Sequence, residues 1–124
     1  MSKILIVDDD PDFVNATRLL MEHEGHQVKW ASGGKQGYQQ VMEEDPDLVI
    51  LDMMMESVME GISVSRKMHQ NSDTSDIPIM MVSSIAQTDY AVLFPPKEYI
   101  YIDAYLDKPV DPTMMVKKVR RILA

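Results

Sequence analysis

The stretch ILIVDDDPD, residues 4–12, decides the fold of this chain. Its four consecutive apolar residues, Ile4–Val7, predict a short strand that is buried on both faces. The strand runs directly into carboxylates, and Asp10 followed by Pro11 is typical of a helix N-cap with proline at the first helical position. The stretch therefore predicts a buried strand, an acidic rim and a helix in immediate succession.

The acidic rim needs an explanation, because like charges this close raise one another's pKa and cost free energy unless something compensates. Asp10 and Asp12 lie where negative charge complements a helix N-terminus, which accounts for them as helix-start residues. Asp8 and Asp9 have no such role, and we expect their partners at the ends of other strands.

The alternation of strand and helix continues along the chain. Further strands are predicted at His26–Ala31, Leu48–Leu51 and Ile77–Val82, and within Tyr99–Leu106. The first helix should end before Gly25 and bury a face made of Phe13, Ala16, Leu20 and Leu19. Ile85–Glu98 contains Pro95-Pro96, so the fourth helix should be short or displaced. This pattern predicts an α/β fold: a doubly wound, flavodoxin-like (βα)5 arrangement of five parallel strands in order 2-1-3-4-5.

Composition narrows the class of protein. The 124 residues suit one domain, residues 1–124, with no output domain. The formal net charge of -8 argues against nucleic-acid binding. The absence of cysteine excludes disulfides, thiol catalysis and cysteine-ligated zinc. No apolar run approaches the roughly 18 residues that span a bilayer, so we expect a cytoplasmic protein without a membrane segment.

Polar residues follow four strands that the predicted order makes neighbours. They are Asp8 with Asp9, Asp52, Ser83 and Lys108. Ligands in open parallel sheets bind outside the carboxyl ends of the strands. Carboxylates without histidine or thiolate suit Mg²⁺, a carboxylate can accept a phosphoryl group, and lysine can neutralise the charge that develops. These residues predict Mg²⁺-dependent phosphoryl transfer to an aspartate.

Four segments in this order resemble the response-regulator receiver domains (CheY-like) of two-component signalling. They are Lys3–Pro11, Asp45–Asp52, Ile77–Ser84 and Tyr105–Pro109. The resemblance implies that Asp52 is the phosphoacceptor. It also implies that Mg²⁺ is held by Asp8, Asp9, Asp52 and the backbone carbonyl of Met54.

Further roles follow from the same resemblance. Lys108 and Ser83 would bind the phosphoryl group, and Ser83 with Tyr105 would form the conformational switch. A separate inference concerns Met54 and Ile85, which lie two residues beyond Asp52 and Ser83 and would tune dephosphorylation. Both are apolar and cannot orient an attacking water, so we hypothesise slow self-dephosphorylation.

The chain departs from the family pattern in two places. Glu56 occupies the usual proline position, and the glycine that follows is Gly61, one residue late. The stretch from Ser83 to Lys108 is also longer than usual. The family's usual partner surface is therefore not assumed.

The resemblance implies a stand-alone receiver that takes its phosphoryl group from a sensor histidine kinase or a phosphotransfer protein. It would be a monomer or weak dimer, and no enzyme beyond Mg²⁺-dependent self-phosphorylation and self-dephosphorylation. One alternative is a receiver-like module that binds partners without phosphorylation. Another is a haloacid-dehalogenase-type phosphatase that uses Asp8 and Asp10, which would leave Asp52 unexplained.

Overall fold

A five-stranded parallel sheet forms the centre of the molecule, with strand order β2-β1-β3-β4-β5. The computed structural model describes residues 2–52, 60–83 and 102–124. The strands are β1 (Lys3–Val7), β2 (Gln27–Ala31), β3 (Leu48–Asp52), β4 (Ile79–Ser83) and β5 (Ala104–Asp107). All adjacent strands pair in parallel. The predicted fold class and strand order are confirmed.

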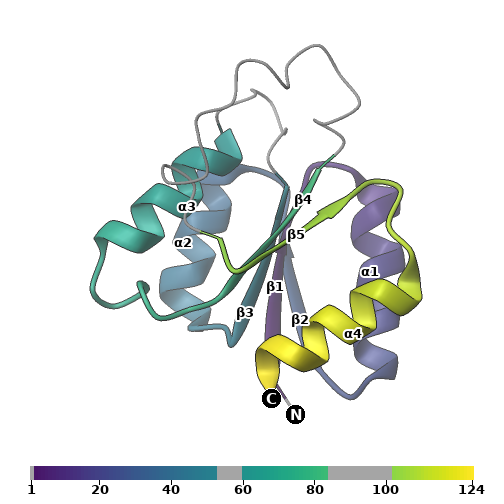
Figure 1. Ribbon diagram of the computed structural model, residues 1–124. Helices are drawn as coiled ribbons and strands as arrows, with labels where there is room; N and C mark the ends of the chain where they lie inside the picture. Colours follow the sequence, from purple (N-terminus) through teal and green to yellow (C-terminus); the bar gives the residue numbers. More distant parts are fainter. Residues whose placement is uncertain (1, 53–59, 84–101) are drawn as a thin grey trace.

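Helices cover both faces of this sheet. They are α1 (Pro11–His23), α2 (Gly34–Glu44), α3 (Glu60–Gln70) and α4 (Pro112–Leu123). Figure 1 shows α1 and α4 on one side of the sheet and α2 and α3 on the other. The segment Ile85–Glu98, where a short or displaced helix was predicted, lies outside the described residues.

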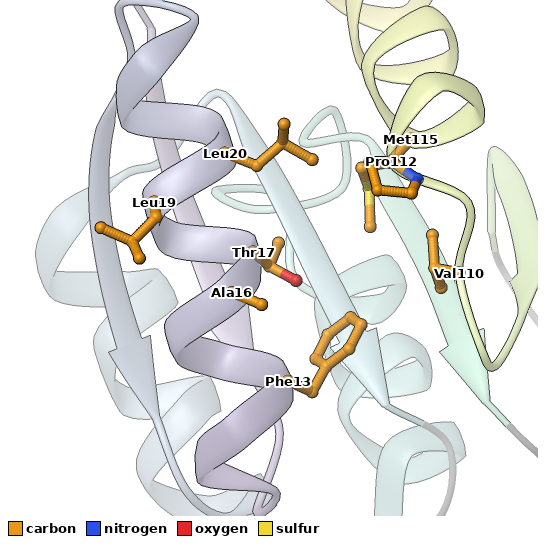
Figure 2. A pocket seen from close by; sticks show the side chains of 8 residues that line it. All are labelled: Phe13, Ala16, Thr17, Leu19, Leu20, Val110, Pro112 and Met115. Atoms are coloured by element: carbon orange, nitrogen blue, oxygen red, sulfur yellow. The ribbon is translucent and has the colours of Figure 1, made fainter.

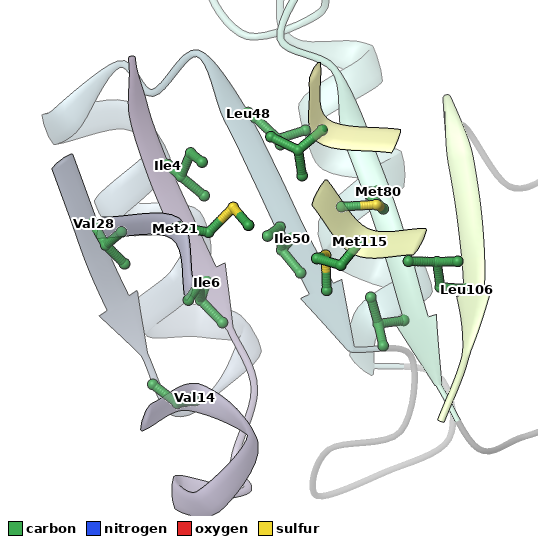
Figure 3. Close-up of a cluster of buried hydrophobic side chains, with 12 residues drawn as sticks. Ile4, Ile6, Val14, Met21, Val28, Leu48, Ile50, Met80, Leu106 and Met115 are labelled. Carbon is green, nitrogen blue, oxygen red and sulfur yellow. The ribbon is translucent and has the colours of Figure 1, made fainter. Parts of the chain in front are cut away.

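Strand β1 is the centre of the core, and all four residues of Ile4–Val7 are 0% exposed. Alternate side chains point to opposite faces of a strand. Ile4 and Ile6 accordingly join the cluster under α1 and α4, drawn in Figure 3, whereas Leu5 and Val7 join the cluster under α2 and α3. The prediction of a strand buried on both faces is confirmed.

The start of α1 also agrees with the sequence. Asp10 is the N-cap, and its Oδ1 accepts hydrogen bonds from the backbone N–H groups of Asp12 at 3.0 Å and Phe13 at 3.4 Å. Pro11 is the first helical residue, and the helix ends at His23, before Gly25.

The predicted apolar face of α1 is partly wrong. The fully buried residues of this helix are Val14, Thr17 and Met21. Phe13 and Leu20 are only partly buried at the margin of the core, and Leu19 is 54% exposed. The buried stripe follows the spacing i, i+3, i+7 but starts one residue later than predicted, which turns Leu19 toward solvent.

Two close contacts place α2. A β-carbon at Gly37 would come within 2.6 Å of Val7 Cγ1, so glycine lets this helix approach β1. The backbone N–H of Gly34 donates a hydrogen bond to Oε1 of Glu60, the first residue of α3. The start of α3 is thereby tied to the start of α2, beside the carboxyl edge of the sheet.

Candidate functional site

The strand register brings the predicted polar residues to one edge of the sheet. Val7 pairs with Leu51 and Asp52 pairs with Val82, so β1, β3 and β4 end at nearly the same level. Asp8 directly follows β1, and Asp52 is the last residue of β3. Lys108 directly follows β5 at the same edge.

Three carboxylates converge there. Asp8, Asp9 and Asp52 each offer a ligand oxygen, and these oxygens all lie within 4.8 Å of one another. Asp8 is 2% exposed and Asp52 is 4% exposed, whereas Asp9 is open to solvent. The cluster thus has a buried floor and one exposed side, where a bound cation could be reached.

The ammonium group of Lys108 lies against this cluster. Its Nζ is 2.9 Å from Asp8 Oδ2 and 3.8 Å from Asp52 Oδ2. The side chain is 19% exposed. Since β4 and β3 separate β5 from β1, the lysine stem reaches across the strand ends to make these contacts. The predicted metal ligands and the predicted phosphate-binding lysine are therefore close neighbours.

The electrostatics of Asp8 reflect this crowding. Burial raises the pKa of its carboxyl above the usual 3.8, and the hydrogen bonds from Lys108 and from the backbone N–H of Asp10 act in the opposite direction. Asp10 N donates to Asp8 Oδ1 at 2.9 Å, and Lys108 bonds the other oxygen.

Three carboxylates and one ammonium leave an excess of negative charge in this cluster. Hard oxygen donors without histidine or thiolate are the ligand set that suits Mg²⁺. The residues present therefore fit a magnesium ion, which would relieve the repulsion between the carboxylates.

The predicted switch residues lie on the two adjacent strands β4 and β5. Tyr105 is partly buried and packs against the cluster under α2 and α3. Burial, together with a hydrogen bond to Asp107, raises its pKa to about 12. Ser83 ends β4 and is in register with Asp107, but its side chain lies outside the described part. Met54 and Ile85 lie outside the described residues.

One contact of Lys108 was not predicted from the sequence. Its Nζ lies 4.4 Å from the centroid of the Phe13 ring. Phe13 was predicted only as part of the apolar face of α1, and no spacing rule connects a residue near the chain start with one that follows the last strand. Knowledge of the strand order was needed to place them together.

Hollows lie on both sides of α1. One, of about 420 Å³, lies between α1 and the start of α4, and its lining includes Phe13, Leu20 and Val110 (Figure 2). The other, of about 370 Å³, lies between α1 and β2 and includes Asp8, Asp9 and Trp30. The acidic cluster thus borders the second hollow, and the ring that contacts Lys108 borders the first.

Known proteins are similar to this chain in sequence and in fold. The family model "Response regulator receiver domain" matches residues 4–120. Protein PilH of Pseudomonas aeruginosa is 34% identical over 124 residues, which cover 100% of this chain and 99% of PilH. A CheY-like receiver domain protein from Methanospirillum hungatei has a crystal structure with a TM-score of 0.84 and 28% identity, covering 99% of this chain and 94% of that one.

Other relatives are longer. The transcriptional regulator RpaA of Synechocystis is 32% identical over 123 residues, which cover 99% of this chain and 49% of RpaA. The chain likewise spans about half the length of several other curated relatives. Within residues 2–52, 60–83 and 102–124, no helix is both long and apolar enough to cross a membrane. From its sequence, its fold and the residues at its strand ends, this chain belongs to the response-regulator receiver domain family.

Proposed function

We propose that Asp52 accepts a phosphoryl group in a Mg²⁺-dependent reaction and that the phosphorylated chain signals through protein contacts. One observation carries the proposal: the carboxylate of Asp52 shares a small, mostly buried space with two further carboxylates and the Lys108 ammonium. A nucleophile, a metal site and a fixed cation are the parts that phosphoryl transfer to a carboxylate requires.

In the transfer step, a carboxylate oxygen of Asp52 forms a bond to the phosphorus of the donor. The bond between phosphorus and the donor's imidazole nitrogen breaks, and its electron pair stays on the imidazole. With an acyl phosphate as donor, the corresponding phosphorus–oxygen bond breaks and a carboxylate leaves. The product in both cases is an aspartyl phosphate on this chain.

Mg²⁺ would be held by Asp8, Asp9 and Asp52, with the backbone carbonyl of Met54 as a further ligand by family resemblance. When bound, it would neutralise charge on the transferring phosphoryl oxygens. Lys108 would move from Asp8 toward the phosphoryl group and contribute a compact positive charge there. Its present distance of 3.8 Å from Asp52 Oδ2 supports this role, because only a short movement separates the two positions.

The signal would pass through Ser83 and Tyr105. A hydroxyl that bonds the phosphoryl group from the end of β4 would shift the balance between two packings of the neighbouring β5 side chain. The register that pairs Met81 with Tyr105 and Ser83 with Asp107 supports this coupling, because the two proposed switch residues belong to one hydrogen-bonded strand pair.

The wider role follows the family. The donor would be a sensor histidine kinase or a phosphotransfer protein, and the single receiver domain, residues 1–124, would act in the cytoplasm as a monomer or weak dimer. Its catalysis would be limited to its own phosphorylation and slow dephosphorylation. The phosphorylation-independent module and the phosphatase are disfavoured, because neither explains the convergence of Asp52 with Asp8 and Lys108.

The test is phosphorylation by acetyl phosphate, followed by intact-mass measurement. Wild type with Mg²⁺ should gain one phosphoryl mass, and a chelator should abolish the gain. Asp52→Asn should gain none, whereas the exposed-site control Asp76→Asn should behave like wild type. An unmodified wild type, or an equally modified Asp52→Asn, would refute the proposal.

A further inference from the structure

The aromatic ring of Phe13 is a third neighbour of the Lys108 ammonium. The nitrogen lies 4.4 Å from the ring centroid, compared with 2.9 Å from Asp8 Oδ2. The ring comes from α1, whereas the carboxylates follow β1 and end β3. An ammonium group over an aromatic face is attracted by the ring quadrupole, and the attraction grows as the pair is desolvated. With a side chain that is 19% exposed, Lys108 meets this condition.

The ring is held in place by the start of α1. The backbone N–H of Phe13 donates to the capping carboxylate of Asp10, and the side chain packs against the edge of the core cluster under α1 and α4. Figure 2 shows the ring pointing from α1 toward Val110, which lies two residues beyond Lys108. Phe13 is thus fixed by the same turn that carries the acidic residues.

A bound Mg²⁺ would compete with Lys108 for the carboxylates, but it would not compete for the Phe13 ring. Mg²⁺ bound at Asp8, Asp9 and Asp52 would take the oxygens that now attract Lys108, and its own charge would repel the ammonium. The lysine stem is flexible, with several rotamers to occupy. A hard cation prefers carboxylate oxygens to an aromatic face, so metal binding leaves the Phe13 contact intact.

We propose that Phe13 is a positioning residue that keeps the Lys108 ammonium at the strand ends once Mg²⁺ has bound, so that it meets the phosphoryl group. The inference rests on the proposed function, since it assumes that Lys108 binds the phosphoryl group at Asp52. The inference gives Phe13 a role beyond packing. Its ring would raise the affinity of the site for the phosphoryl group, and this effect would require Lys108.

The experiment measures the affinity for beryllofluoride, a phosphoryl mimic, by calorimetry in saturating Mg²⁺. Phe13→Leu should weaken binding about tenfold, an effect between those of an exposed and of a fully desolvated cation–π contact. Phe13→Tyr retains the ring and should stay within about twofold of wild type.

A double-mutant cycle separates positioning from packing. In a Lys108→Met background, Phe13→Leu should have no further effect on beryllofluoride affinity. Leu20→Ala is the matched control, because Leu20 lines the same hollow as Phe13 and its substitution should leave beryllofluoride affinity unchanged. If Phe13→Leu fails to fold, Phe13→Met keeps a bulky apolar side chain without a ring and should show the same loss.

The outcomes distinguish the two proposals. An unchanged affinity in Phe13→Leu or Phe13→Met, or an equal loss with and without Lys108, overturns the positioning role and leaves the phosphoacceptor site standing. Loss of affinity in Leu20→Ala equal to that in Phe13→Leu also overturns it, because packing would then suffice. No beryllofluoride binding by wild type would refute the proposed function itself.

Discussion

Replacing Asp8 by asparagine should stabilise the metal-free protein. Asparagine keeps the shape of the side chain and an oxygen that accepts from the backbone N–H of Asp10. It removes the negative charge of Asp8, a residue that is only 2% exposed. At an effective dielectric constant of about 20, the repulsion between two carboxylates whose oxygens lie within 4.8 Å of each other costs at least about 3.5 kcal/mol. The attraction to Lys108 at 2.9 Å returns about 6 kcal/mol. Two relieved repulsions slightly exceed one lost attraction, so we expect a gain of about 1 kcal/mol, or about 3–5 °C in Tm.

The pH dependence of the folded state's stability also predicts that Asp8→Asn stabilises the metal-free protein. Because burial raises the pKa of Asp8 in the folded state, its contribution to stability is fully present below the unfolded value of 3.8 and is lost as the pH rises through the raised value. At neutral pH the ionised carboxylate is therefore a cost that asparagine avoids. The gain from Asp8→Asn should shrink as the solution is acidified toward pH 4.

In the presence of Mg²⁺, wild type should become more stable than Asp8→Asn. A ligand at 100 times its Kd stabilises the folded state by about 2.7 kcal/mol, and Asp8→Asn loses one of the metal's carboxylates. Thermal unfolding with a chelator and with Mg²⁺ measures both effects. Asp76→Asn controls for net charge, since Asp76 is an exposed residue between α3 and β4, away from the cluster. If Asp8→Asn is less stable than wild type without metal, or gains as much from Mg²⁺, the reasoning is wrong.

Three further substitutions test other parts of the account. Gly37→Ala should destabilise by about 1–2 kcal/mol in urea unfolding, because overpacking against Val7 at 2.6 Å outweighs the better helix propensity of alanine; an increase in stability would show that the helix can shift freely. Asp10→Ala should cost about 1 kcal/mol through the lost N-cap bonds, and Asp10→Ser should restore most of it; equal losses in both would mean that the cap contributes nothing. Met54→Asn should accelerate phosphate loss from the phosphorylated chain, because an amide can orient the attacking water; rapid loss from wild type that this change does not accelerate would contradict the hypothesis of slow dephosphorylation.

The sequence was sufficient to predict the fold because its strongest signals are local. Continuous apolar runs such as Ile4–Val7 and Leu48–Leu51 can be read without tertiary information, and each ends in a carboxylate at the carboxyl edge. Once the strand order is known, the meeting of Asp8 with Asp52 follows from geometry.

The features that the sequence did not predict depend on how α1 is rotated about its axis and on how far the Lys108 side chain extends. The buried stripe of α1 is offset by one residue from its predicted position, since several apolar side chains of this helix compete for the core. Contacts of Lys108 depend on the path of a flexible stem across two strands, which no pattern of residue types encodes. The ring of Phe13 became a site neighbour only when the sheet brought the two ends of the chain together.

The position of the phosphoryl group on the chain tests the central claim most directly. Wild type is phosphorylated with acetyl phosphate and Mg²⁺ and treated with borohydride, which reduces an aspartyl phosphate to homoserine, and the peptides are then sequenced by mass spectrometry. The account predicts homoserine at position 52 and at no other aspartate, including Asp8 and Asp9, which should serve only as metal ligands. Reduction at another aspartate in place of position 52, or phosphate on a serine or histidine, would contradict it.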